Sequence, residues 1–280
     1  MSSEKNKTKN HHSNGDFRFF KNASLQGFIS LRFSEKAITN LSELDSLLEK
    51  AKLDKDSKST TAGVIKLDGK QYFLKRYNNK NFQKKLKNSV RETRPFKALK
   101  TSRALNEIDV FTPEIYAALN YRRGLLLESS YLVSSFVEST KTADKIIEDL
   151  VEEQGFSIFV DKACQILTKI HDAGIMHGDI KISNILVMPK TDDSYEIGLI
   201  DLDGSSCFPK ALSKGKRIYD LARLISSYFR SCRDRRLATQ DLVHLSQKFI
   251  DKYQELTAID LAGNSLSKRV QYLSTRVRKK

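Results

Sequence analysis

The stretch HGDIKISNILV, residues 177–187, decides the fold of this chain. It combines a short polar loop with an apolar run that predicts a buried strand. A second apolar strand is predicted to end at Asp201, in the segment LIDLDG of residues 199–204. The two segments place a carboxylate, Asp179, and two potential Mg²⁺ ligands, Asn184 and Asp201, on loops at strand ends. Phosphoryl transfer uses such a set, because its transition state is stabilised by positioning and by metal-borne charge.

The spacing of these residues resembles the catalytic loop of the protein-kinase-like superfamily. In the pattern H-R-D-x-x-x-x-N, the Asp accepts the substrate hydroxyl proton and the Asn binds a metal ion. Asp179 and Asn184 keep that spacing, and Asp201 falls where D-F-G supplies a metal ligand, although this chain has D-L-D. Gly178 replaces the Arg and gives the HGD form of small-molecule kinases, lipid-sugar kinases and some atypical protein kinases. The alternative is a polar loop between two core strands that matches by chance.

The segment before this region predicts a strand lysine. Asp68-Gly69 separates two strand-like runs and indicates a hairpin, and Lys75 lies in its second run. In the kinase resemblance, Lys75 holds the α- and β-phosphates of ATP; an ordinary solvent-facing lysine is the alternative. A Gly-rich loop should precede the hairpin, but that segment has only Gly63. Ala98 occupies the position expected for the glutamate that pairs with the lysine, so the sequence names no partner for Lys75.

Three further segments narrow the resemblance. They are GKQYFLK at 69–75, VFTP at 110–113 and SYL at 130–132. These features are similar to those of the lipopolysaccharide kinase group, which contains the 3-deoxy-manno-octulosonic acid (Kdo) kinases and the core heptose kinases. The resemblance covers roughly residues 60–230 and implies ATP and Mg²⁺ as cofactors. It assigns catalysis to Asp179 and Lys181, ATP binding to Lys75, and metal binding to Asn184 and Asp201.

The expected fold class is α+β, a protein-kinase-like two-lobed fold with a small antiparallel-sheet N-lobe and a mainly helical C-lobe. Residues 1–16 have few apolar side chains and are predicted to be a disordered tail. We assign residues 17–135 to the N-lobe and residues 136–280, with a basic C-terminal helix, to the C-lobe. In the C-lobe, apolar residues recur at helical spacing from Phe156 to Ile170 and again around Asp220.

Asp220 has two interpretations. It resembles the buried helix aspartate that holds the catalytic loop of kinases, and an ordinary surface aspartate is the alternative. Asp220 also lies only 19 positions after Asp201, and no A-P-E sequence intervenes. A regulated protein kinase fits a longer activation and peptide-docking segment there. The spacing therefore favours an acceptor other than a peptide, because sugar kinases of this superfamily commonly lack that platform.

The charge of the chain indicates anionic partners. The formal net charge is +15, and residues 75–103 contain eleven Lys or Arg against the single Glu92. Such a surface suits anionic lipid headgroups or, as a less favoured partner, nucleic-acid phosphates; solvated basic helix faces without a partner are the alternative. Cys164, Cys207 and Cys232 are widely spaced and indicate neither a disulfide framework nor a zinc site.

The sequence shows no apolar run of membrane-spanning length and no signal-peptide core. We therefore expect a cytoplasmic protein, with peripheral attachment to the cytoplasmic face of the inner membrane as an option. The predicted function is ATP-dependent phosphorylation of a sugar hydroxyl on a lipopolysaccharide-type glycolipid, with no obligate protein partner. An atypical protein serine/threonine kinase of the small HGD-containing type and a pseudokinase-like binding module are the alternatives.

Overall fold

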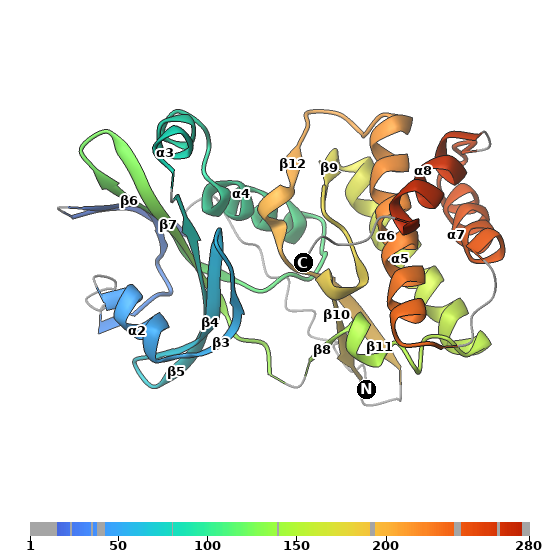
Figure 1. Ribbon diagram of the computed structural model, residues 1–280, viewed down its shortest axis with the longest axis horizontal. Helices are drawn as coiled ribbons and strands as arrows, with labels where there is room; N and C mark the ends of the chain where they lie inside the picture. Colours follow the sequence, from blue (N-terminus) through green and yellow to red (C-terminus); the bar gives the residue numbers. More distant parts are fainter. Residues whose placement is uncertain are drawn as a thin grey trace, which may run out of the picture. The chain divides into compact units, whose positions relative to one another are not determined.

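The computed structural model describes residues 16–22, 24–34, 36–37, 43–79, 81–138, 140–190, 194–237, 242–261 and 264–275 (Figure 1). The predicted disordered tail lies outside these ranges, apart from Asp16. The described chain forms two compact units. The first contains the described residues up to Ser89 together with Ile115–Val133, and the second contains Val90–Glu114 and the described residues from Ser134 onward.

The first unit is built on a seven-stranded sheet in the order β1-β2-β6-β7-β5-β4-β3 (Figure 1). Its strands are β1 (Phe17–Lys21), β2 (Leu25–Ser30), β3 (Lys52–Asp56), β4 (Thr60–Leu67), β5 (Lys70–Asn78), β6 (Ile115–Arg123) and β7 (Leu126–Ser135). The pairs β1–β2, β2–β6, β3–β4 and β4–β5 are antiparallel. The predicted antiparallel-sheet lobe is confirmed.

The predicted hairpin forms between β4 and β5. Asp68 and Gly69 have φ values of 48° and 75°, and Leu67 pairs with Lys70 across the turn. A two-residue hairpin loop of this kind needs positive φ at both central positions, which Asp-Gly adopts at low cost. The turn therefore sets the register of the β4–β5 pair, in which Lys75 of β5 lies opposite Ala62 of β4.

Two helices accompany this sheet, α2 (Leu44–Lys50) and α3 (Phe82–Ser89). Leu44 and Leu48 of α2 join the buried cluster that includes Leu74 and Ala117 of the sheet. Leu41, Leu44, Leu47 and Leu48 follow helical spacing in the sequence, with Thr39 or Asn40 as a possible N-cap. Thr39 and Asn40 lie outside the described residues, and α2 begins after Glu43. The apolar spacing predicted the helix because Leu44 and Leu48 lie one turn apart on its buried face.

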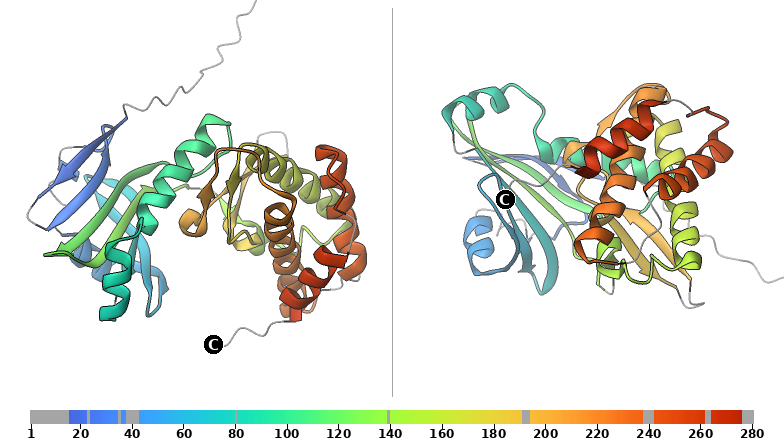
Figure 2. Two further views of the ribbon diagram at one scale, coloured as in Figure 1. Left: turned by 90° about the horizontal axis from the view of Figure 1, so that it is seen from above. Right: turned by 45° about the vertical axis from the view of Figure 1, so that its right-hand side comes forward.

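The second unit is mainly helical, as predicted. Its helices are α4 (Arg94–Glu107), α5 (Glu153–Asp172), α6 (Lys214–Asp234), α7 (Leu242–Thr257) and α8 (Asn264–Thr275). Helix α5 packs on α7, and α6 packs on α8 (Figure 2). Phe159, Tyr228 and Phe249 meet in the core, with ring centroids 6.0 Å apart for the first two. The basic residues after Thr275 lie outside the described part of the predicted C-terminal helix.

Short strands and turns of the second unit carry the motif residues. They are β8 (Lys141–Thr142), η2 (Ala143–Ile146), β9 (Ile175–Met176), η3 (Ile182–Asn184), β10 (Ile185–Pro189), β11 (Tyr195–Leu199), η4 (Leu202–Gly204) and β12 (Ser206–Cys207). They form the sheets β11-β10-β8 and β12-β9. The strand predicted to end at Asp201 ends at Leu199 instead, because Asp201 has a left-handed backbone, with φ 61°, that does not continue a strand.

The boundary between the units differs from our division at residue 135. Residues 90–114, which we assigned to the N-lobe, group with the second unit. Helix α4 packs against η4 and β12, and the Thr101 and Ser205 hydroxyl oxygens lie 2.6 Å apart in the buried contact. The local sequence of α4 does not indicate which unit covers the buried face of this helix.

Candidate active site

A buried aspartate on α6 fixes the start of the HGD loop, residues 177–184. Asp220 is fully buried. One of its carboxylate oxygens accepts the backbone N–H of His177 at 2.8 Å, and the other accepts the N–H of Gly178 at 2.9 Å. Because both oxygens bind the loop backbone, the buried interpretation of Asp220 is confirmed and the surface interpretation is wrong.

A chain of buried polar groups continues from Asp220. His171 Nε2 lies 3.4 Å from Asp220 Oδ2, and His171 Nδ1 lies 2.7 Å from the Tyr253 hydroxyl. Arg217 donates to the same hydroxyl at 3.0 Å. Burial lowers the pKa of His171, which keeps the ring neutral. We assign the tautomer in which Nε2–H donates to Asp220 and Nδ1 accepts from Tyr253, because this arrangement satisfies all three groups.

His177 joins the HGD loop to the segment that precedes Asp201. Its ring is buried, and burial lowers its pKa. The neutral ring donates from Nε2 to the backbone oxygen of Ile200 at 3.1 Å. A second link is the Ile200 N–H, which donates to the backbone oxygen of Asn184 at 3.0 Å. These two bonds keep the loop and the Asp201 segment together.

The backbone conformation at position 178 explains why this chain has Gly where the H-R-D pattern has Arg. Gly178 has a φ of 76°, which disfavours any residue with a side chain, and a Cβ built there would lie 2.3 Å from the backbone oxygen of Gly204. A Cβ contact of that length with a backbone atom requires the chain to shift. The backbone of this loop therefore demands glycine, and arginine is excluded by sterics.

Restoring the arginine is expected to damage the site. Gly178→Ala should lower the free energy of unfolding by at least about 1 kcal/mol and reduce phosphoryl transfer, because Ala adds the clashing Cβ and opposes positive φ. Gly178→Arg should behave no better than Ala. Urea unfolding and turnover measure the two effects. Gly215→Ala, at a site where a Cβ meets nothing within 4 Å, is the control for the unfolding measurement. Wild-type behaviour of Gly178→Arg would contradict the steric account.

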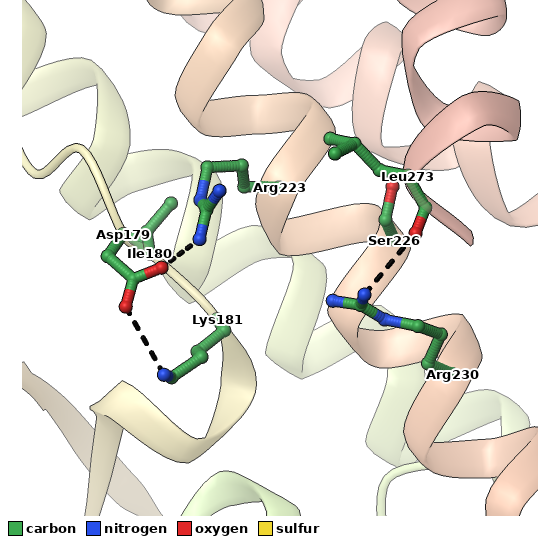
Figure 3. Close-up of a pocket in the computed structure, with 7 residues that line it drawn as sticks. All are labelled: Asp179, Ile180, Lys181, Arg223, Ser226, Arg230 and Leu273. Atoms are coloured by element: carbon green, nitrogen blue, oxygen red, sulfur yellow. Dashed lines mark hydrogen bonds and ion pairs between the residues drawn. The ribbon is translucent and has the colours of Figure 1, made fainter. Parts of the chain in front are cut away.

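The Asp179 carboxylate contacts cations from two elements (Figure 3). Lys181 Nζ lies 3.2 Å from Oδ2, and Arg223 of α6 forms an ion pair with Oδ1. The Asp179 side chain is 36% exposed, so it remains accessible to a substrate. Lys181 was predicted beside Asp179, but Arg223 was not, because it comes from a helix 44 positions further along the chain.

Asn184 and Asp201, the two predicted metal ligands, lie on adjoining segments. Asn184 Nδ2 donates to the backbone oxygen of Asp179 at 3.0 Å, so Oδ1 is the atom of this amide that would bind a metal ion. Asp201 has φ 61° and ψ 53°, a conformation that is rare for residues other than glycine and that clusters at functional sites. Amide and carboxylate oxygens are suitable ligands for Mg²⁺.

The described residues contain no group of three or more His, Cys, Asp or Glu side chains able to hold a metal ion. Mg²⁺ is commonly held by one or two carboxylates, with substrate phosphates and water completing its shell. An amide and a carboxylate on joined loops fit that kind of site better than a cage made of protein ligands.

Lys75 lies in the first unit and is buried. Its side chain is 8% exposed, and its Nζ lies 5.3 Å from the centroid of the Tyr77 ring. The solvent-facing alternative is therefore wrong. Lysine is rarely this buried without a partner or a function. Ala98 is buried on α4, where we expected the family glutamate, and Glu107 near the end of that helix is exposed.

The segment after Asp201 is short. Residues 202–213 hold only η4, the two-residue strand β12 and a loop before α6 begins at Lys214. Gly174, whose added Cβ would lie 2.4 Å from the backbone oxygen of Phe208, shows how closely this segment packs on the rest of the unit. Nothing in residues 202–213 forms a separate platform for a peptide.

Comparison with known proteins identifies one family and solved structures of similar fold. A search of curated proteins found no match. A solved structure described as "WaaP in complex with acyl carrier protein" is similar in fold, with a TM-score of 0.53 and 17% identity, covering 83% of this chain and 91% of that chain. A sequence profile described as the lipopolysaccharide kinase (Kdo/WaaP) family matches residues 42–253. With a kinase-like fold, a loop built around Asp179 and a match over most of its length, the chain belongs to the lipopolysaccharide kinase (Kdo/WaaP) family of phosphotransferases.

Proposed function

We propose that this kinase transfers the γ-phosphoryl group of ATP to a sugar hydroxyl of a lipopolysaccharide-type glycolipid. The observation that carries the proposal is the HGD loop, whose partly exposed Asp179 carboxylate lies on the same segment as Asn184 and next to the Asp201 segment. The short segment after Asp201 supports a non-peptide acceptor. Family membership supports lipopolysaccharide biosynthesis as the process.

Each predicted site residue has a role in this reaction. Asp179 orients the acceptor hydroxyl and takes its proton, while the hydroxyl oxygen forms a bond to the γ-phosphorus and the bond from that phosphorus to the ADP oxygen breaks. Lys181 offsets the charge on the moving phosphoryl group, and Lys75 anchors ATP. Asn184 and Asp201 would hold Mg²⁺, which supplies positive charge to the phosphates.

The test compares a strain lacking the protein with its parent. We expect the lipid-linked core glycan of the deletion strain to be lighter by one phosphate, as measured by mass spectrometry. Purified protein with Mg·ATP should restore the mass, whereas the Asp179→Asn variant should not. Unchanged glycolipid masses, with phosphate incorporated into a protein by the wild-type enzyme only, would favour the atypical protein-kinase alternative. Absence of ATP turnover on any acceptor would favour the pseudokinase-like module.

The proposed location is cytoplasmic, with peripheral attachment to a membrane. Among the described helices, none has the length and apolar composition needed to cross a bilayer. Helix α3 has two features of a membrane-surface helix. Phe82 and Leu86, one turn apart, are 66% and 55% exposed, and the lysine Lys87 is exposed beside them. Leu125, 89% exposed, lies in the β6–β7 turn, and Arg122 and Leu127 on either side of this turn donate hydrogen bonds to Ser89 of α3.

Anionic vesicles should bind through this apolar and basic surface. Phe82→Ser combined with Leu86→Ser should lower vesicle partitioning by at least about tenfold, because each buried side chain contributes roughly 1.5–3 kcal/mol. Vesicle sedimentation measures the effect, and added salt should weaken the wild-type binding. The control, Phe19→Ser with Leu31→Ser, removes two apolar side chains of similar exposure from the same unit. Equal binding to neutral and anionic vesicles would contradict a role for the basic charge.

A protein partner is a separate question. The WaaP structure was solved with an acyl carrier protein. We propose that this chain needs no obligate protein partner for transfer. Purified protein that is active without a carrier protein would support this proposal, and activity that appears only when a carrier protein is added would overturn it.

A further inference from the structure

A basic pocket lies beside Asp179. It has a volume of about 270 Å³ and is walled by the HGD loop, α6 and the end of α8 (Figure 3). Lys181, Arg223 and Arg230 line it together with Asp179. Three cationic side chains therefore line the same pocket as the carboxylate of the proposed base.

The pocket continues along the groove between α6 and α8. A second pocket of about 570 Å³ shares Arg223 and Leu273 with the first and adds Lys268 and Arg269 from α8. The residues that line the two pockets comprise five basic side chains and one acidic side chain, Asp179.

The arginines of this groove are arranged around an aromatic ring. The Arg269 guanidinium lies 4.5 Å from the centroid of Tyr219, and the Arg223 guanidinium lies 5.7 Å from the same centroid. Stacking of this kind holds a guanidinium in place while leaving its N–H groups able to bind an anion. The ring thus preorganises two cations of the groove.

Some basic residues at the groove have a structural role in the C-terminal end of α8. Arg230 donates to the backbone oxygen of Leu273 at 3.3 Å, and Arg233 donates to that of Ser274 at 3.2 Å, so both residues cap the C-terminal end of α8. Capping of α8 does not account for the presence of Arg223, Lys268 or Arg269 in the groove. Burial and then the charges of Arg230 and Arg269 lower the pKa of Arg223, so the like charges oppose one another in the protein without ligand.

We propose that this groove binds an anionic group of the acceptor, a phosphate or a carboxylate, and so presents a neighbouring hydroxyl to Asp179. The proposal rests on the proposed phosphotransferase function and specifies its substrate class: an acceptor that already carries negative charge close to the hydroxyl. Arginine forks bind phosphate and carboxylate through paired hydrogen bonds. Five cations against one carboxylate give the groove the complementary charge.

Arg223 connects the proposed base, Asp179, with the proposed anion-binding groove. It pairs with Asp179 and also lines both pockets. An anion in the groove offers Arg223 an alternative partner, which frees Asp179 to accept the hydrogen bond of the acceptor hydroxyl. The Arg223 side chain thus couples binding of the anionic group to release of the Asp179 carboxylate from its ion pair.

The first experiment measures anion binding without catalysis. Inorganic phosphate, glucuronate and glucose are added to the full chain at constant ionic strength, and the thermal midpoint is recorded. We expect phosphate, glucuronate or both to raise the thermal midpoint, and glucose to leave it unchanged. A larger shift with phosphate would indicate a phosphate site, and a larger shift with glucuronate would indicate a carboxylate site. The variant Lys268→Gln with Arg269→Gln should lose the shift. Arg235→Gln with Arg236→Gln, which removes the same charge from exposed positions at the end of α6, should keep it.

The second experiment uses extracted glycolipid as the acceptor. The Lys268→Gln, Arg269→Gln variant should raise the KM for the glycolipid by about tenfold or more, with kcat and the KM for ATP nearly unchanged, because it removes charge-assisted bonds to the acceptor only. A variant that transfers phosphate and binds the anions like wild type would overturn the proposal. Anion binding in the groove without any transfer to glycolipid would instead leave the groove as an anion site and overturn the proposed function.

Discussion

Replacement of Asp179 by Asn is expected to reduce phosphoryl transfer by about 10²- to 10⁴-fold, the usual contribution of a positioned general base. Asn has the same size and keeps one oxygen, but it cannot take the hydroxyl proton. It also loses the ion pairs with Lys181 and Arg223. ATP binding should stay close to wild type, because the role proposed for Asp179 concerns the acceptor and not the nucleotide. Calorimetric ATP binding and phosphate incorporation separate the two effects.

The matched variant is Asp201→Asn. It should weaken Mg·ATP binding as well as transfer, because a metal ligand acts on the nucleotide before the chemical step. Asp203→Asn, two residues further on in D-L-D, tests which of the two carboxylates is the ligand and should be the milder change. Wild-type turnover in Asp179→Asn would contradict the role of Asp179 as base. A larger loss of Mg·ATP binding in Asp203→Asn than in Asp201→Asn would indicate that Asp203 is the metal ligand.

The sequence predicted the parts of the fold that local patterns determine. Asp68-Gly69 specified the β4–β5 hairpin because few residue pairs adopt two positive φ values, and the observed values are 48° and 75°. Apolar spacing predicted α5 and α6 because each buries one face. The strand β3 has no such signal: all five of its residues are exposed, and its backbone pairing with β4 holds it at the sheet edge.

The site was predictable where its residues are close in sequence. Asp179, Lys181 and Asn184 lie on one loop, so a motif can identify them together. Arg223 reaches Asp179 only because α6 packs beside the HGD loop, and no local pattern carries that information. The need for glycine at position 178 likewise depends on Gly204, which a separate segment brings within contact distance.

Asp220→Ala is expected to be the most destabilising single change at the site, by about 3–5 kcal/mol, the range for breaking a buried charged network. The backbone N–H groups of His177 and Gly178 would lose their acceptor inside the core, and His171 would lose the carboxylate beside its Nε2. Each unsatisfied buried group costs about 1–3 kcal/mol. The HGD loop would also lose the anchor that sets the position of Asp179, so transfer should fall with stability.

Asp220→Asn separates these two consequences. Asn keeps one acceptor oxygen, so one of the two loop N–H groups remains bonded and the other faces an amide N–H₂. Unfolding in urea should therefore show a smaller loss of stability than for Ala, while turnover measured well below the unfolding midpoint should remain strongly reduced. The control is Asp234→Asn, 70% exposed at the end of the same helix, where loss of the exposed Arg233 ion pair should cost within about 1 kcal/mol. If Asp220→Asn instead kept full turnover with reduced stability, the aspartate would hold the fold together without positioning the catalytic loop.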